Sequence, residues 1–259
     1  AASDVYKRQI EKALKYIVGL KGGFQIVEQK GRTYLFDNNG NPMREFVKDY
    51  QSKLETSTLS SIVDYFAGDP DKVFTNGKNF IIRVGGIDKV DLMSEVSDEM
   101  LRDEFLHVRA DLPDKFPFDR YMDLETFNIM LQSRFLDTED RAKLLALTAN
   151  VVDESVSTYG DDGTSQKTIV KSGVASVAEV KVPNPVTLKP FRTFAEAEQP
   201  ESKFVFRMRK NEDGVTAALI EADGGAWKVQ AIRNIADYLE NCLEEKLTAE
   251  QMARITILA

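Results

Sequence analysis

The spacing of hydrophobic residues changes along the chain and divides it into helical and extended segments. Apolar side chains recur every three or four positions in several segments, which is typical of helices with one buried face. The most regular pattern is near the end of the chain, where Ile232, Ile235, Leu239 and Cys242 share one side. The predicted helices span residues 9–20, 56–69, 124–135, 138–152 and 226–246.

Polar residues at the ends of these segments predict where the helices begin and end. Ser57 or Thr58 can cap the second helix, and Gly68 can end it. Asp123 and Thr138 are expected to cap the third and fourth helices by accepting hydrogen bonds from free backbone N–H groups. The short connection between these two predicts a pair of neighbouring antiparallel helices at the centre of the chain.

Elsewhere hydrophobic and polar residues alternate between turns rich in Gly, Pro and Asn, which predicts strands and hairpins. One hairpin is expected to turn at Lys30-Gly31 and another at Gly85-Gly86. Further strands are expected in the segments 157–173, 177–191, 203–209, 215–222 and 254–259. Strands and helices are grouped rather than alternating. The pattern therefore predicts an α+β fold with mainly antiparallel sheets, a central helical pair and a C-terminal amphipathic helix.

The length of 259 residues suits one or two domains. We expect an N-terminal α+β part at residues 10–100, with hairpins and a short helix. A C-terminal α+β part at residues 101–259 is expected to follow, either as a second domain or continuous with the first.

The first nine residues have a different origin in our interpretation. The stretch Asp4-Val5-Tyr6-Lys7-Arg8-Gln9 resembles the translation of a transposase adapter used in sequencing libraries. The alternative is a charged helix start, because Tyr6 and Ile10 follow helical spacing. We favour a non-native addition at residues 1–9 and exclude it from the interpretation of the fold.

Composition and charge narrow the classes of function. The chain has 42 Asp and Glu against 34 Lys and Arg, a net charge of −8 that disfavours non-specific attraction to nucleic acid. It has one cysteine, so it can form no intrachain disulfide, and this fits a cytoplasmic location. No apolar run approaches the length of a membrane span, so we expect no membrane partner.

Familiar catalytic and metal-binding patterns are missing from the sequence. His107 and Cys242 are the only residues of their types, and a buried structural cysteine is far more common than a reactive Cys-His pair. One histidine and one cysteine cannot make the usual zinc site. The stretch 37–48 begins like a calcium loop but has Pro42 and Lys48 where glycine and glutamate are needed. We therefore expect no cofactor and favour a non-enzymatic protein.

The pair Asp161-Asp162 has two interpretations. Two neighbouring carboxylates can bind a hard metal ion or act as acid and base. Followed by Gly163, however, they suit the backbone angles of a hairpin turn, which is the interpretation that we favour.

Two segments contain candidate binding residues. In "KFVFRMRK", residues 203–210, apolar Phe204 and Phe206 alternate with Arg207 and Arg209. These arginines can present planar donors to phosphate or carboxylate groups. The alternative, which we favour on an acidic protein, pairs them with glutamates of a neighbouring strand.

The second segment is "EADGGAWK", residues 221–228. Asp223 precedes two glycines and a predicted helix whose first turn contains Trp227. Free N–H groups at a helix N-terminus can bind an anion. In the favoured alternative Asp223 caps the helix and Trp227 packs in the core.

Three longer stretches together carry a resemblance to a known family. They are "FPFDRYMDLETFNIMLQSRF", "VPNPVTLKPFRTFAEAEQPESKFVFRMR" and "EADGGAWKVQAIRNIADYL". In this order they resemble an uncharacterised family of bacteriophage and prophage proteins similar to the YfdQ type, over about residues 101–243. The resemblance implies a phage origin and the cytoplasm of an infected bacterium. It implies no reaction and no site residues.

Three functions remain open at this point. The favoured one is a non-enzymatic phage accessory protein that contacts a phage or host protein, or forms a homo-oligomer. The alternative is a nucleic-acid- or nucleotide-binding protein that uses Arg192, Arg207, Arg209 and Lys210 as a local patch. The third is an enzyme that depends on clustered carboxylates or a metal ion. The candidate binding residues overall are Arg192, Arg207, Arg209, Asp223 and Trp227.

Overall fold

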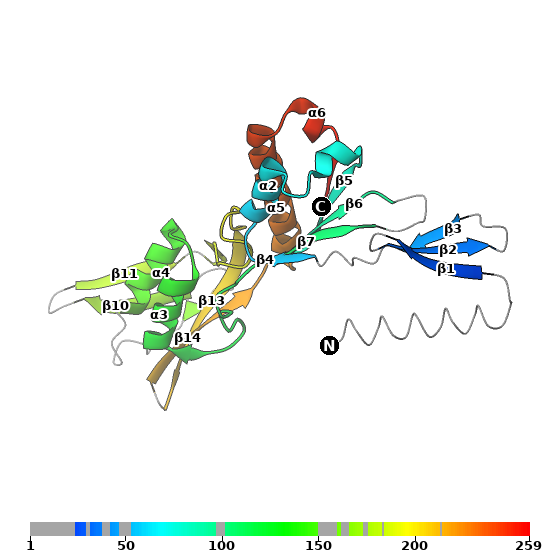
Figure 1. Ribbon diagram of the computed structural model, residues 1–259. Coiled ribbons are helices and arrows are strands. Elements are labelled where there is room, and N and C mark those ends of the chain that lie inside the picture. The colour runs from blue at the N-terminus through cyan, green and yellow to red at the C-terminus, as the bar shows by residue number, and fades with distance from the viewer. Residues whose placement is uncertain are drawn as a thin grey trace. The chain divides into compact units, whose positions relative to one another are not determined.

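The computed structural model of the protein describes residues 24–29, 32–37, 42–46, 53–96, 102–149, 160–161, 166–172, 176–182, 184–212 and 214–259 (Figure 1). These belong to two compact units, residues 1–52 and residues 53–259. The helix predicted at residues 9–20 and the expected addition at residues 1–9 lie outside the described residues. The chain has the predicted α+β fold, in which antiparallel strand pairs predominate.

The first unit contains one antiparallel sheet in the order β1-β2-β3. Its strands are β1 (Phe24–Gln29), β2 (Arg32–Asp37) and β3 (Pro42–Phe46). Gln29 pairs with Arg32, so two residues connect β1 to β2. This confirms the hairpin predicted at positions 30 and 31, although these two residues are themselves outside the described part.

A five-stranded sheet forms one half of the second unit, in the order β15-β5-β6-β7-β4. Its central strands β5 (Phe80–Gly86), β6 (Lys89–Ser94) and β7 (Glu104–Arg109) are antiparallel. The edge strands β15 (Ile255–Leu258) and β4 (Leu54–Thr56) pair in parallel with β5 and β7. β6 ends before residue 100 and β7 begins after it, and the two strands pair with each other. One sheet therefore contains strands from both sides of the boundary predicted between residues 100 and 101.

The β5–β6 hairpin turns later than the sequence predicts. Gly85 and Gly86 belong to β5, and the turn consists of Ile87 and Asp88. A register shift between Val84 and Gly86 accommodates the two glycines in the strand. The glycines thus allow an irregular strand end, and the turn follows them.

Helices cover one face of the five-stranded sheet: α2 (Ser60–Gly68), α5 (Ala226–Lys246) and the short α6 (Ala249–Met252), with the 3-10 turn η1 (Val73–Asn76). The predicted face of α5 is confirmed, since Ile235, Leu239 and Leu243 are buried in the core. No helix among the described residues combines the length and apolar character needed to cross a membrane. The largest fully buried side chains of this core are Phe66, Phe80, Phe194, Leu59, Ile62, Ile82 and Leu92.

A four-stranded antiparallel sheet, β12-β13-β14-β8, forms the other half of this unit. Its strands are β12 (Val186–Leu188), β13 (Ser202–Asn211), β14 (Gly214–Glu221) and β8 (Met122–Asp123). The predicted alternation along β13 is confirmed, because Phe204, Phe206 and Met208 are buried in a second core. A smaller sheet, β11-β10-β9, consists of β9 (Gly160–Asp161), β10 (Gln166–Ser172) and β11 (Ser176–Val182).

Asp161 is the last residue of β9 and pairs with Gln166. The connection between β9 and β10 therefore lies at residues 162–165, outside the described part of the chain. The hairpin predicted near Asp161-Asp162 is present, with Asp161 in the strand.

The central helical pair is α3 (Leu124–Arg134) and α4 (Glu139–Ala149). Asp123 accepts a hydrogen bond of 2.8 Å from the backbone N–H of Thr126, and Thr138 accepts one of 3.1 Å from Arg141, which confirms both predicted caps. The Arg141 side chain donates to the carbonyl of Leu131. The Thr148 hydroxyl, two turns further along α4, bonds to Asn128, earlier in α3. A residue later in α4 thus contacts a residue earlier in α3, as expected for antiparallel neighbours.

Residues 189–201, the junction segment, connect the two cores. The isolated bridge between Phe135 and Pro190 attaches its beginning to the end of α3. Further along, Phe194 lies in the core of the five-stranded sheet, and the Thr193 hydroxyl donates a 2.5 Å hydrogen bond to the carbonyl of Ile87. The junction segment therefore contacts both sheets within a few residues.

The predicted cap of α2 is wrong. The residue before the helix is Leu59, and neither Ser57 nor Thr58 caps it with a side chain. Instead the carboxylate of Glu196, in the junction segment, accepts hydrogen bonds of 2.7 and 2.9 Å from the backbone N–H groups of Leu59 and Ser60. A carboxylate is favourable there because the N-terminus of a helix carries partial positive charge.

Replacing Glu196 should destabilise the protein, because two N–H groups would lose a charged acceptor. We expect Glu196→Ala to lower the free energy of unfolding by about 1–3 kcal/mol, measured by urea denaturation. Glu196→Gln retains an acceptor oxygen and should cost less. Ser57→Ala, the matched control at the position predicted from sequence, should leave stability unchanged; an equal loss in both variants would contradict the assignment.

The cap at Asp123 predicts a pH dependence. The hydrogen bond from the backbone of Thr126 lowers the pKa of Asp123. A carboxyl group whose pKa is lower in the folded state stabilises the fold above its unfolded pKa, and this contribution is lost as pH falls through the folded value. Asp123→Ala should therefore cost about 1 kcal/mol at neutral pH and progressively less as the pH falls below the ordinary aspartate pKa of about 4. The stabilities of Asp123→Asn and Asp123→Ala should both lack the pH dependence that Asp123 gives the wild type. A cost of Asp123→Ala that stays constant with pH would refute this explanation.

Candidate functional site

Three of the candidate binding residues, Arg192, Asp223 and Trp227, lie together between the four-stranded sheet and the start of α5. Arg192 is only 8% exposed. Its guanidinium carbon lies 4.4, 4.5 and 5.2 Å from the ring centroids of Trp227, Phe118 and Phe204. The positive charge of Arg192 is therefore enclosed by three aromatic rings, which favour a cation over their faces.

The charge of Arg192 is balanced by acidic residues at the end of β14. Arg192 Nη2 lies 2.8 Å from Glu221 Oε1. Burial lowers the pKa of Arg192, while the negative charges of Glu221 and Asp223 oppose that change. Since an arginine remains protonated even so, the cluster is a buried cation with partly exposed counter-charges.

Asp223 does not cap α5 as the favoured interpretation of the sequence predicts. The residue before α5 is Gly225, in the left-handed conformation with φ of 82°, and no side chain caps the helix. Asp223 Oδ1 instead accepts a hydrogen bond of 3.0 Å from the N–H of Gly225, which shapes the turn. Trp227 is buried, as that interpretation expects, and packs on Arg192.

The cluster is short of hydrogen-bond partners. Within the described residues, Arg192 Nη1, Asp223 Oδ2 and Trp227 Nε1 are buried and have no hydrogen-bond partner. Each buried polar atom without a partner costs free energy. The rings of the cluster are already occupied by Arg192, so its geometry favours a structural contact between β13, β14 and α5 over an open binding site.

Arg207 and Arg209 lie on the opposite face of β13 from Phe204 and therefore away from Arg192. The guanidinium carbon of Arg209 is 3.8 Å from the ring centroid of Tyr121, and Arg207 donates to the carbonyl of Phe206. Neither arginine forms an ion pair with a carboxylate of the described residues, so the expected pairing with glutamates is not found there. The three arginines do not form a single patch.

A second charged cluster lies on the face of the five-stranded sheet that the helices do not cover. We call Arg83, Lys89, His107 and Arg109 the cationic face. Arg83 and His107 flank Asp91 in one row across β5, β6 and β7, while Lys89 pairs with Arg109 in the next row. Side chains two residues apart on a strand share a face, so all four lie on one side.

The carboxylate of Asp91 organises this face. The Asp91 side chain is 6% exposed. Its Oδ2 atom lies 3.2 Å from Arg83 Nε and 3.8 Å from Lys89 Nζ, and its Oδ1 atom lies 2.5 Å from His107 Nδ1. Arg109 Nη2 lies 3.4 Å from His107 Nε2. The imidazole of His107 therefore lies between Asp91 and Arg109, with Nδ1 facing the carboxylate and Nε2 facing the guanidinium.

Asp91 neutralises only part of the charge around it. Three permanent positive charges, those of Arg83, Lys89 and Arg109, lie around buried Asp91. Glu55 of β4, which pairs with His107, adds one exposed negative charge at the end of the row. The side chain of Arg83 is 52% exposed, and Arg109 is exposed as well. These outward groups can donate charge-assisted hydrogen bonds to a carboxylate or phosphate of a partner.

His107 and Cys242 cannot form a catalytic pair in this fold. Cys242 packs against the core between α5 and the sheet, on the side of Val90 and Val108. His107 lies on the other side, beside Asp91. Among the described residues, no group of three or more His, Cys, Asp and Glu side chains could hold a metal ion. The side chains of the stretch 37–48 are outside the described ones.

Sequence reasoning missed the cationic face although each strand contains a signal. In "IRV", "VDL" and "LHVR" a charged or polar residue stands between apolar residues, which indicates a solvent-facing position. What the sequence does not supply is the register that places Arg83, Asp91 and His107 in one row.

Comparisons with known proteins identify no relative: no family model, no curated protein and no solved structure matches the chain. The resemblance to YfdQ-type phage proteins stays a prediction.

Removing the buried cation should destabilise the fold. Arg192→Ala leaves a space between three aromatic rings and an unpaired Glu221, so we expect a loss of about 2–4 kcal/mol in urea denaturation. Arg192→Met, which refills much of the space, should recover part of it. Arg209→Ala is the matched control, and its loss should be below about 1 kcal/mol because its contact with Tyr121 is exposed. Similar losses for Arg192→Ala and Arg209→Ala would contradict the structural role.

Proposed function

We propose that the protein is a non-enzymatic accessory protein of a bacteriophage or prophage that acts in the host cytoplasm by contacting another protein. The observation that supports this proposal most directly is the cationic face. It is an exposed set of fixed cations on an acidic chain, on a sheet face that no described helix covers.

The arrangement suits binding rather than chemistry. Asp91 holds Arg83 and His107 in place, so less side-chain entropy is lost when a partner binds. The donors point to a partner with acidic side chains, which arginine can bind through two parallel hydrogen bonds. The phage setting and the cytoplasmic location come from the resemblance alone and are part of the proposal.

An acidic protein suits this face better than a nucleic acid. The cations occupy two cross-strand rows on three strands, a width of about 10 Å at the spacing of strands in a sheet. A nucleic acid needs a longer row of cations to neutralise several phosphates, and the net charge of −8 opposes its approach. One or two carboxylates of an acidic segment fit the smaller area.

The alternative is a nucleic-acid- or nucleotide-binding protein, and one observation favours it. Exposed Arg209 and half-buried Tyr121 form an arginine–aromatic contact on the outer face of β13. Such surfaces stack nucleic-acid bases with little sequence preference. The pair of β13 arginines can therefore be tested against the cationic face.

The test uses a fluorescently labelled oligoglutamate peptide and a single-stranded DNA of equal charge, with binding measured by anisotropy at low salt. We expect the peptide to bind the full chain. The double variant Arg83→Gln/Arg109→Gln should weaken this binding by about tenfold, or 1.4 kcal/mol. The matched control, Arg207→Gln/Arg209→Gln, removes the same charge and should leave peptide binding unchanged.

Other outcomes would overturn the proposal. Peptide binding that both double variants weaken equally would mean that only net charge matters. DNA that binds more tightly than the peptide, and is lost in the β13 variant, would establish the alternative function.

A further inference from the structure

An acidic stretch of α5 lies on the helix-covered side of the five-stranded sheet. An open depression of about 230 Å³ lies along α5 and is lined by Glu198, Asn234, Asp237, Tyr238 and Asn241. We call it the acidic groove. Glu240 and Glu244 are exposed on the same helix, at the helical spacing that places them beside Asp237 and Asn241.

The acids of the groove are largely uncompensated. Lys189 Nζ lies 3.2 Å from Glu198 Oε1. Asp237, Glu240 and Glu244, by contrast, form no ion pair with the described residues. These three carboxylates of α5 are therefore available to a cation from outside.

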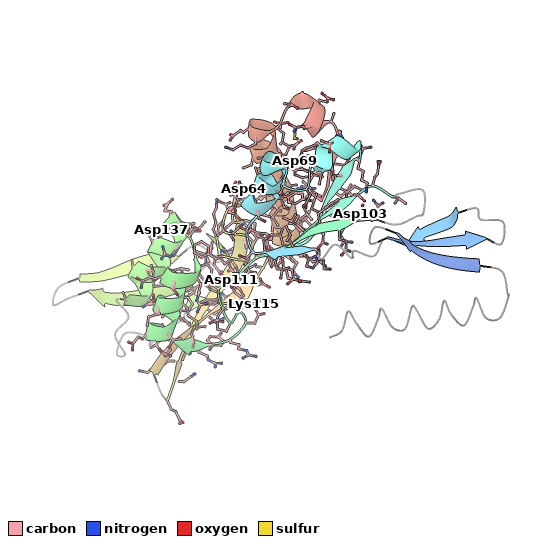
Figure 2. The ribbon with its side chains drawn as sticks, viewed as in Figure 1. Asp64, Asp69, Asp103, Asp111, Lys115 and Asp137 are labelled. Atoms are coloured by element: carbon pink, nitrogen blue, oxygen red, sulfur yellow. The ribbon has the colours of Figure 1, made fainter. Side chains whose placement is uncertain are left out.

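Tyr238, which lines the groove, has a raised pKa. Burial raises the pKa of Tyr238 to about 12, and the nearby carboxylates of Glu196 and Asp64 add to the increase. Asp64, labelled in Figure 2, extends the acidic surface onto α2. Acids from two helices and the junction segment thus surround one side of the groove.

The cationic face and the acidic groove lie on opposite sides of the same sheet. The cationic residues alternate with the buried residues Val90 and Val108, on which the helix layer packs. α5 belongs to that layer, so its exposed acids lie on the far side from Arg83 and Arg109. One copy cannot bring its own two surfaces together.

We infer that the acidic partner of the cationic face is the acidic groove of a second copy of this chain. This inference rests on the proposed function and names its partner. Arg83 and Arg109 of one copy pair with carboxylates around Asp237 and Glu244 of the next. Because the two surfaces differ, the contact is head-to-tail, and each copy keeps one free surface of each sign for further copies.

Charge complementarity is the argument for this occupant. Two chains of net charge −8 repel each other at long range, and that repulsion is screened beyond about a Debye length of 8 Å at physiological salt. At contact, fixed cations meet uncompensated carboxylates. The assembly therefore requires this one relative orientation, and strong salt should weaken it.

The test is sedimentation velocity on the full chain, with two charge variants. One carries Arg83→Gln and Arg109→Glu in the cationic face, and the other carries Asp237→Lys and Glu244→Lys at the acidic groove. We expect the wild type to form a concentration-dependent series of oligomers that is lost at high salt. Each variant alone should sediment as a monomer, with circular dichroism confirming that it is folded.

Mixing the two variants gives the decisive result. The mixture contains one intact surface of each kind, so it should form dimers and stop there. A wild type that stays monomeric at every concentration, or oligomers that neither variant alters, would overturn the inference. Oligoglutamate binding that still depends on Arg83 and Arg109 in a monomeric wild type would leave the proposed function standing, with a different acidic protein as partner.

Discussion

The buried side-chain amide of Gln199 fixes the backbone conformation of the junction segment. The placement of the two cores relative to each other depends on that conformation. Gln199 is 4% exposed; its oxygen accepts hydrogen bonds from the N–H groups of Arg192 and Thr193, and its nitrogen donates 2.9 Å to the carbonyl of Phe194. A segment without helix or sheet hydrogen bonds can be buried only if its backbone groups find such partners. The side chain of Gln199 supplies several of them here.

From this fixed segment, side chains reach both halves of the unit. Arg192 enters the aromatic cluster beside Phe204, while Glu196 caps α2 and the carbonyl of Glu198 accepts a 2.7 Å hydrogen bond from Asn234 of α5. The cap of α2 thus comes from 136 residues further along the chain. Residues 189–201 contact helix α2, helix α5 and the four-stranded sheet. A substitution in this segment should therefore affect the packing of all three.

The parts that the sequence predicted are those set by neighbours along the chain. The alternation in β13, the apolar face of α5 and the caps at Asp123 and Thr138 involve residues two to four positions apart, and all are confirmed. The cap of α2 failed because its acceptor is distant in sequence. For the candidate residues, sequence placed Arg192 with Arg207, but the path of the junction segment puts Arg192 inside and leaves Arg207 on the other face of β13. The cationic face depends on cross-strand register, which local patterns do not specify.

The distribution of charge follows from the same layered construction. In a sheet covered on one side, alternate residues of each strand are buried under the helices, and the others can carry charge. In β5, β6 and β7 these positions hold Arg83, Lys89, His107 and Arg109 around buried Asp91. On the exposed side of α5, the stretch 237–245 carries four acids and no base, and the bases Lys228, Arg233 and Lys246 stand before and after it. The net charge of −8 averages over two surfaces of opposite sign on opposite sides of one sheet. Net charge alone is therefore a poor guide to what either surface can attract.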